Sequence, residues 1–158
     1  MLDINQYMEK VSVTKKSYVQ KWIDHGQIPG VQKDKDGNYL FPNSARRPYQ
    51  SRCTPQSTAK TIRGAIVNAC LKRQYISPET FFLSEKEFDG YVTDLIRAEL
   101  IVKREEDGIV YYDSTLKSDS VKGKKAGEIV KWVNHCISVL EPVLSIAASA
   151  LTIGVTQV

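Results

Sequence analysis

Two Asp-Gly pairs, Asp36-Gly37 and Asp107-Gly108, constrain the fold of this 158-residue chain more than any other feature. Each pair lies between two short runs of residues that favour β-strands. An Asp-Gly pair in that setting is a strong signal for a two-residue β-hairpin turn. Helical periodicity precedes both pairs. The sequence therefore predicts an α+β fold, mainly α with small β-hairpins, in which a group of helices followed by a hairpin occurs twice.

Residues 1–43 form the first of these modules. Asp3 and Gln6 have the spacing of a capping box, which starts a helix. Ser12 or Thr14 can cap a second helix, which ends before Gly26. The apolar positions recur every three or four residues, at Ile4, Tyr7, Met8 and Val11 in the first helix and at Tyr18, Val19, Trp22 and Ile23 in the second.

A hairpin completes the module. We expect its strands over Val31–Lys33 and Tyr39–Phe41, with Pro42 ending the second strand. Two short helices joined by a tight turn make a helix-turn-helix unit. The hairpin that follows such a unit is called its wing.

The run VTKKSYVQKWIDHGQIPGVQKDKDGNYLFP resembles the excisionase/MerR-type winged helix-turn-helix DNA-binding domain. The elements that match in order are Trp22-Ile23, Gly26, Ile28-Pro29 and Leu40-Phe41-Pro42. One departure is the turn Val11-Ser12-Val13-Thr14, which lacks the glycine that this family usually has there. The resemblance implies that the second helix enters the major groove of DNA and that the wing contacts the adjacent backbone or minor groove.

The candidate DNA contacts lie on the polar side of the second helix, on the wing and just beyond it. They are Thr14, Lys15, Lys16, Ser17, Tyr18, Gln20, Lys21, Lys33, Lys35, Asn38, Tyr39, Arg46 and Arg47. Lysine and arginine neutralise phosphates, whereas Ser17 and Gln20 can hydrogen-bond base edges. The alternative is that these charges only solubilise an ordinary helix. Tyr18 and Tyr39 are open to both a core position and a DNA contact.

Charge is distributed unevenly along the chain. Residues 1–73 hold 13 Lys/Arg against 5 Asp/Glu, a net of +8, whereas residues 74–117 hold 5 against 10, a net of −5. Such an asymmetry suggests two surfaces with different partners, although charges can also cluster by chance on solvated faces. Residues 44–57, rich in Ser, Thr, Pro and Arg, are predicted to be a basic linker.

Residues 58–117 are predicted to form the second helix-and-hairpin module. The run DLIRAELIVKREEDGIVYYDST resembles the closing part of bacterial winged-helix regulators. The helix equivalent to the DNA-reading one carries Glu85, Glu87, Asp89 and Asp94. Carboxylates repel phosphates, and DNA binding gains from charge neutralisation. We therefore expect this module to contact a protein partner.

The last part of the chain is predicted to be a flexible joint over 118–127 and a long apolar helix over 128–158. A heptad seam that would pair helices in a homo-oligomer consists of Val130, Val133, Ile137, Leu140, Leu144, Ala147 and Leu151. The alternative is a membrane tail anchor, since residues 142–158 carry no charge. That stretch is shorter than the roughly 20 apolar residues of a spanning helix, which favours the oligomer.

The sequence gives no sign of an enzyme, a cofactor or a metal site. Cys53, Cys70 and Cys136 are odd in number and widely spaced, which favours a reduced, intracellular chain. With the predicted DNA binding, we expect a cytoplasmic, nucleoid-associated protein. The interpretation we favour is an oligomeric transcriptional regulator that binds specific double-stranded DNA. The alternatives are an excisionase-like architectural factor of a mobile element or phage, and a structural adaptor tethered by its tail to a membrane or an assembly. Excisionases are often little more than the first module, so the length of this chain favours a regulator.

Overall fold

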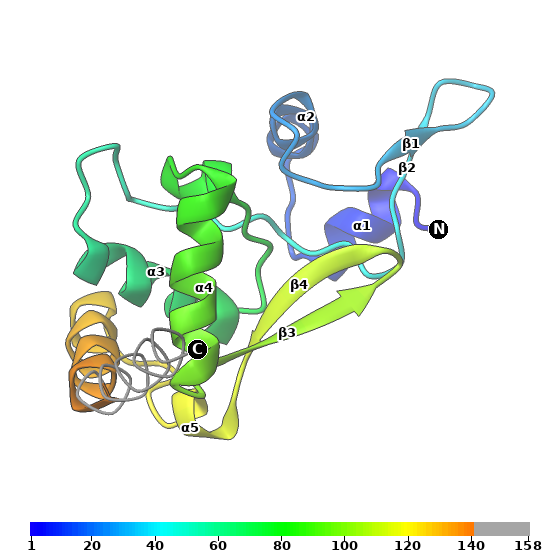
Figure 1. The fold of residues 1–158 in the computed structure, drawn as a ribbon. Helices are drawn as coiled ribbons and strands as arrows, with labels where there is room; N and C mark the ends of the chain where they lie inside the picture. Colours follow the sequence, from blue (N-terminus) through cyan, green and yellow to red (C-terminus); the bar gives the residue numbers. More distant parts are fainter. Residues whose placement is uncertain (141–158) are drawn as a thin grey trace, which may run out of the picture.

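The computed structural model describes residues 1–140 and shows an α+β fold, as predicted (Figure 1). The elements of the first part are α1 (Ile4–Lys10), α2 (Lys16–Asp24), β1 (Gln32–Lys33) and β2 (Tyr39–Leu40). Those of the second part are α3 (Ala59–Leu71), a 3₁₀ turn η1 (Pro78–Phe81), α4 (Glu85–Arg97), β3 (Ile101–Glu106), β4 (Ile109–Ser114) and α5 (Leu116–Asp119). Residues 126–140 are also helical. Within the described part, β1 pairs with β2 and β3 with β4, both antiparallel.

The two helices of the first part start in different ways. The predicted capping box of Asp3 and Gln6 is present at the start of α1. The start of α2 differs from the prediction, because Lys15 is its N-cap residue and provides no side-chain cap. Ser12 instead takes a left-handed conformation (φ 57°) in the turn between the helices. Gly26 (φ 66°) ends α2 as predicted, since glycine adopts this conformation without steric cost.

The two Asp-Gly pairs form different turns. Asp107 and Gly108 (φ 54° and 75°) make the predicted two-residue turn between the paired residues Glu106 and Ile109. The prediction of a two-residue turn is wrong for the first hairpin. There the Gly37 N–H donates to the Asp34 carbonyl and the Asp34 N–H to the Asn38 carbonyl, which leaves a three-residue loop. The carboxylate of Asp34 also accepts from the backbone N–H groups of Asp36 and Asn38, both at 2.9 Å.

The first part has its own apolar core. Tyr7 and Phe41 are fully buried and stack with ring centroids 4.4 Å apart. Val19 and Trp22 bury one face of α2 against them, and the other core members are Met8, Val13, Ile28 and Ala45. Leu2 bridges to Phe41 and extends the first hairpin. The core therefore fixes which face of α2 remains exposed.

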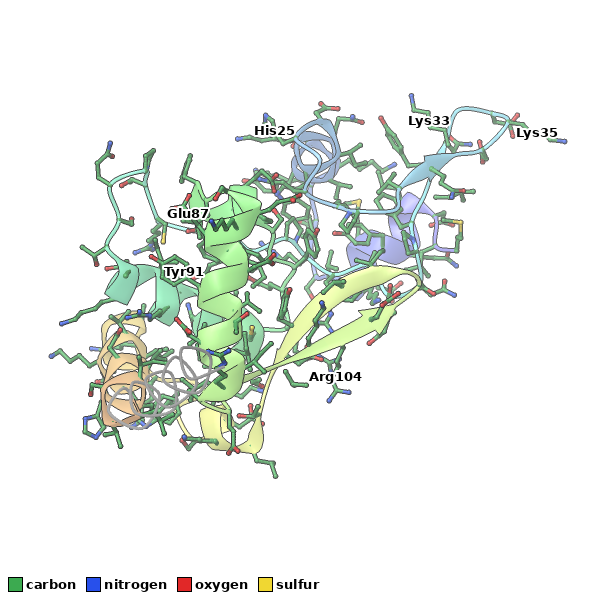
Figure 2. All side chains as sticks on the ribbon, viewed as in Figure 1. His25, Lys33, Lys35, Glu87, Tyr91 and Arg104 are labelled. Carbon is green, nitrogen blue, oxygen red and sulfur yellow. The ribbon has the colours of Figure 1, made fainter. Side chains whose placement is uncertain are left out.

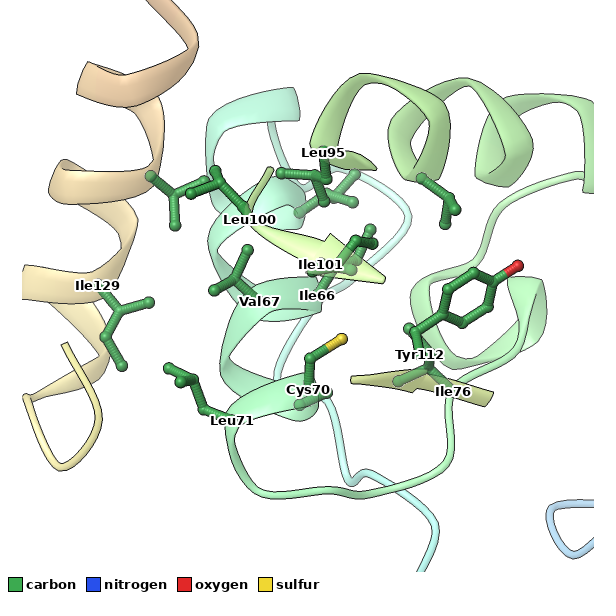
Figure 3. Close-up of a cluster of buried hydrophobic side chains, with 14 of the residues drawn as sticks. Ile66, Val67, Cys70, Leu71, Ile76, Leu95, Leu100, Ile101, Tyr112 and Ile129 are labelled. Atoms are coloured by element: carbon green, nitrogen blue, oxygen red, sulfur yellow. The ribbon is translucent and has the colours of Figure 1, made fainter. Parts of the chain in front are cut away.

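A second core lies between α3, α4, the β3–β4 hairpin and the 126–140 helix (Figure 3). Its fully buried side chains include Ile66, Val67, Leu95 and Leu100. Burial raises the pKa of the Cys70 thiol, which leaves Cys70 a neutral core residue, as its place on the apolar face of the helix predicts. In Figure 1 the β3–β4 hairpin extends from this core to α1 of the first part.

The 126–140 helix differs from the predicted long apolar helix. It is amphipathic, since Val133 and Ile137 are buried whereas Lys131 and His135 are exposed. Its apolar side packs on α3, so closely that a Cβ atom at Gly64 would lie 2.8 Å from the Cα of Val130. Val133 and Ile137 are therefore buried in their own chain, and Val130 and Leu140 are partly buried there. Leu144, Ala147 and Leu151 lie outside the described residues.

Two predicted connections are packed rather than solvated. Within 44–57, the residue pair Pro48 and Tyr75 forms a parallel bridge, with the Tyr75 N–H donating to the Arg47 carbonyl at 2.9 Å. Within 118–127, Ser118 is buried in α5 and Val121 is buried just after this helix. None of the described helices combines the length and the apolar character that crossing a bilayer requires.

Candidate nucleic-acid interface

The exposed face of α2 carries the residues that the sequence assigns to DNA. Burial of Val19 and Trp22 turns Lys16, Ser17 and Gln20 outward, because these positions lie on the opposite side of the helix. The remaining candidates of this segment, Thr14, Lys15, Tyr18 and Lys21, are also exposed. Lysine amines and short polar side chains are thus exposed together on α2.

Of the two tyrosines with open assignments, Tyr18 is outside the core and 50% exposed. The Lys15 ammonium lies 5.7 Å from the centre of its ring. Tyr39 is half-buried and packs against the first core, and the Lys33 ammonium lies 5.3 Å from its ring centre. Tyr18 is therefore free to contact a ligand with its ring, whereas the ring of Tyr39 supports the hairpin.

Gln20 connects α2 to the hairpin. Its side-chain amide nitrogen donates to the Asp24 carboxylate at 2.8 Å and to the Tyr39 hydroxyl at 3.0 Å. Both N–H groups of the amide are used in this way, and the amide oxygen remains an acceptor. The amide thus ties β2 to the exposed side of α2, a positioning role that the sequence did not indicate.

The hairpin presents Lys33, Lys35 and Asn38 to solvent. Figure 2 shows Lys33 and Lys35 on the projecting loop, and His25 at the end of α2 along the same edge of the view. The carboxylate of Asp34 is engaged by backbone N–H groups within the turn. The lysines are therefore the groups that this loop offers to an anionic partner.

Arg46 has a different place from the one predicted. It is 8% exposed, and its guanidinium donates to both oxygens of Asp113, at 2.6 and 3.3 Å. The guanidinium also lies 4.4 Å from the centre of the Tyr111 ring, and Arg104 pairs with Asp113 at 2.9 Å from the outer side. Arg46 thus joins the two parts of the chain and leaves the set of candidate DNA contacts.

Arg47 is half-buried next to α2, and within residues 1–140 it is not paired with a carboxylate as Arg46 is. Its guanidinium lies 5.6 Å from the centre of the Trp22 ring. It lines a hollow of about 340 Å³ together with Tyr18, Lys21, His25 and Gln50. Sequence reasoning missed His25 and Gln50 as members of this surface. The signal that could have found Gln50 was weak, because it lies in a segment without periodicity.

Most acidic residues of the second part are exposed, whereas Asp94 is half-buried and Asp113 is buried against Arg46. Glu85, Glu87 and Asp89 lie on the outer side of α4, and Glu105 and Glu106 lie on β3. An open cleft of about 920 Å³ separates the two parts and mixes both signs of charge, with Lys10, Arg47 and Arg73 opposite Glu106 and Asp107. The Ser44 N–H donates to the Asp107 carboxylate at 3.0 Å, and hydrogen bonding from Ser44 lowers the pKa of this carboxyl.

Among residues 1–140, no group of three or more His, Cys, Asp or Glu side chains is placed to hold a metal ion. The sequence matches no protein-family model and no curated protein.

Proposed function

We propose that this protein binds double-stranded DNA through α2 and the β1–β2 hairpin, and that these elements act as a winged helix-turn-helix of the excisionase/MerR type. The observation that carries the proposal is the face of α2. Its apolar side is buried, and its exposed side gathers Lys15, Lys16, Ser17 and Lys21 beside the hairpin lysines. A positively charged helix on a projecting surface suits the major groove of DNA.

The proposed contacts divide into two kinds. The lysines of α2 and of the hairpin, together with Arg47, neutralise phosphates and supply affinity that does not depend on sequence. Ser17, through its hydroxyl, and Gln20, through its free amide oxygen, read base edges. Because the amide nitrogen of Gln20 is held by Asp24 and Tyr39, the oxygen has a fixed direction.

We further propose that the protein is a cytoplasmic, nucleoid-associated transcriptional regulator. Its second part would be a second winged-helix module that contacts a protein partner. Two observations support this division. Glu85, Glu87 and Asp89 are solvent-exposed on α4, where they would repel a DNA backbone. The second part also has its own apolar core. It is therefore a folded module and not a short extension of the first part.

Fluorescence anisotropy with labelled duplexes tests the DNA proposal. We expect Lys16→Ala and Lys21→Ala to weaken binding to all duplexes and to lower the slope of log affinity against log salt by about one each. Gln20→Ala should instead reduce the preference for a selected site over a random duplex, because it removes a base contact. Lys124→Ala is the matched control, since it removes an exposed lysine that lies away from α2.

The proposal fails if the wild-type chain binds no duplex at low salt, or if Lys16→Ala and Lys21→Ala behave like Lys124→Ala. Circular dichroism of each variant shows whether the helices are intact. If a variant loses DNA binding but keeps its helical signal, the loss is due to the missing side-chain contact and not to unfolding.

A further inference from the structure

A groove of about 510 Å³ lies between α3 and the 126–140 helix, away from the proposed DNA surface. Its charged lining consists of Lys60 and Arg63 from α3 and Lys131 from the other helix, and His135 lies beside them. None of the described residues that line it is acidic. The charged side chains that line the groove are therefore all basic.

Helix packing fixes the walls of this groove. Gly64 lets α3 approach the backbone of Val130 closely. The Asn134 amide nitrogen then donates to the carbonyl of Lys60 at 2.9 Å and to that of Val130 at 2.8 Å. Because a hydrogen bond and a close backbone contact hold the two helices together, their basic side chains are brought to the same opening.

Two residues that line the groove each have one buried polar atom without a hydrogen-bond partner among the described residues. These atoms are the Nε of Arg63, a donor, and the Oδ1 of Asn134, an acceptor. The guanidinium of Arg63 lies 5.8 Å from the centre of the Tyr91 ring of α4, which Figure 2 labels. Unpaired buried polar atoms are rare and costly in folded proteins. A suitable ligand would bring an acceptor to Arg63 and a donor to Asn134.

We propose that this groove binds a phosphate group. A phosphate monoester or inorganic phosphate offers charged oxygens to Arg63, Lys60 and Lys131. In its singly protonated forms inorganic phosphate also keeps an O–H, which can donate to the Oδ1 of Asn134. Sulfate has a similar size and charge but carries no proton at neutral pH, so it satisfies Arg63 and leaves Asn134 unpaired. The groove should therefore prefer phosphate to sulfate.

The inference does not depend on DNA binding, because the groove shares no residue with α2 or the first hairpin. The phosphate can come from a small phosphate-bearing molecule or from the backbone of a nucleic acid. Both sources offer charged oxygens to Lys60, Arg63 and Lys131, but a phosphodiester has no O–H to donate to the Oδ1 of Asn134. Separate titrations with inorganic phosphate, tripolyphosphate and duplex DNA distinguish them.

The test is a titration of the full chain followed by NMR of its two histidine side chains. We expect phosphate and tripolyphosphate to cause a saturable shift of the His135 imidazole signals, with weaker binding of sulfate at matched ionic strength. His25 lies on the proposed DNA surface, so its signals report separately on binding there. Lys131→Gln should weaken the binding of tripolyphosphate about tenfold, the effect of losing one charge-assisted hydrogen bond.

Lys60→Gln is the second variant, and its exposed position makes a folding defect unexpected. Lys103→Gln, on β3, is the matched control and should bind like the wild type. If Lys131→Gln also weakens duplex DNA binding, the phosphate comes from nucleic acid, whereas unchanged DNA binding assigns the groove to a small molecule. No saturable shift of His135, equal affinity for sulfate, or equal affinity in Lys131→Gln and the wild type overturns the proposal.

Discussion

At the scale of single residues, Arg46 and Arg47 show how neighbours of the same type take opposite roles. Arg46 is buried against Asp113 and Tyr111, whereas Arg47 is half-buried beside Trp22. The sequence could not separate them, because its pattern in this segment has no periodicity that distinguishes inside from outside. The partner of Arg46 is also 67 residues away along the chain.

The two arginines should therefore respond differently to substitution. Arg46→Met leaves the carboxylate of Asp113 buried with one remaining partner, Arg104, so we expect a loss of about 3 kcal/mol in the free energy of unfolding. Arg47→Ala should lower that free energy by about 1 kcal/mol or less, since it removes only the contact with the Trp22 ring, and should weaken DNA binding. Urea unfolding of both variants measures the loss of stability, and fluorescence anisotropy with labelled duplexes measures DNA binding. Equal losses of stability would contradict the assignment.

At the scale of elements, the local signals were sufficient for most of the fold. The capping box at Asp3 and the glycine at position 26 define helix ends through contacts within a few residues. The turn at Asp36-Gly37 was predicted with the wrong length, because Asp34 captures the backbone of the loop with its carboxylate. That side-chain contact competes with the two-residue turn. Asp34 lies two positions before Asp36, and the residue two positions before Asp107 is Glu105, whose longer side chain accepts no such hydrogen bond from the second turn.

At Gly64, the close packing of two helices opposes the intrinsic preference of a helix for alanine over glycine. Alanine favours a helix over glycine by about 1 kcal/mol, but its Cβ would lie 2.8 Å from the Cα of Val130. A backbone atom cannot move aside without shifting the 126–140 helix. We therefore expect Gly64→Ala to destabilise the protein by about 1–3 kcal/mol, measured by urea unfolding.

Gly90→Ala is the matched control for this variant. Gly90 lies in α4, and a Cβ there would meet no atom within 4 Å. The same substitution should stabilise the protein by up to about 1 kcal/mol. Effects of the same sign at both positions would show that the close approach of α3 to the 126–140 helix does not limit the side chain at Gly64.

At the scale of the whole molecule, contacts between distant parts of the chain determine which helices and segments pack together, and the sequence pattern did not predict them. The heptad pattern of Val130, Val133 and Ile137 was real, but the same spacing serves a helix that packs on α3 of its own chain. Periodicity gives the buried face of a helix and does not identify its partner. The segment after Pro42 looked like a linker for a similar reason, since its packing partners are Tyr75 and β4, far along the sequence.

These contacts join the two parts of the molecule into one structure. Ser44 donates its N–H to Asp107, and the hydroxyls of Ser44 and Tyr111 lie 3.2 Å apart. The hydroxyl of Tyr7, in the first core, donates to the carbonyl of Arg46 at 2.9 Å. The guanidinium of the same residue is held in the second part. Unfolding of either core should therefore remove contacts that the other needs.

The two tryptophans of the chain allow this coupling to be measured, because Trp22 lies in the first core and Trp132 packs against the second. In Trp22→Phe and Trp132→Phe, the remaining tryptophan reports on one core through its fluorescence. Within each of the variants Trp22→Phe and Trp132→Phe, we expect the urea unfolding curves from fluorescence and from circular dichroism to coincide. Coincident curves indicate that the two cores unfold cooperatively. Adding Arg46→Met to each variant should separate the two transitions, since it removes the Asp113 contact that joins the parts. If fluorescence and circular dichroism already gave different midpoints in Trp22→Phe or Trp132→Phe alone, the two parts would be independent domains joined by a tether.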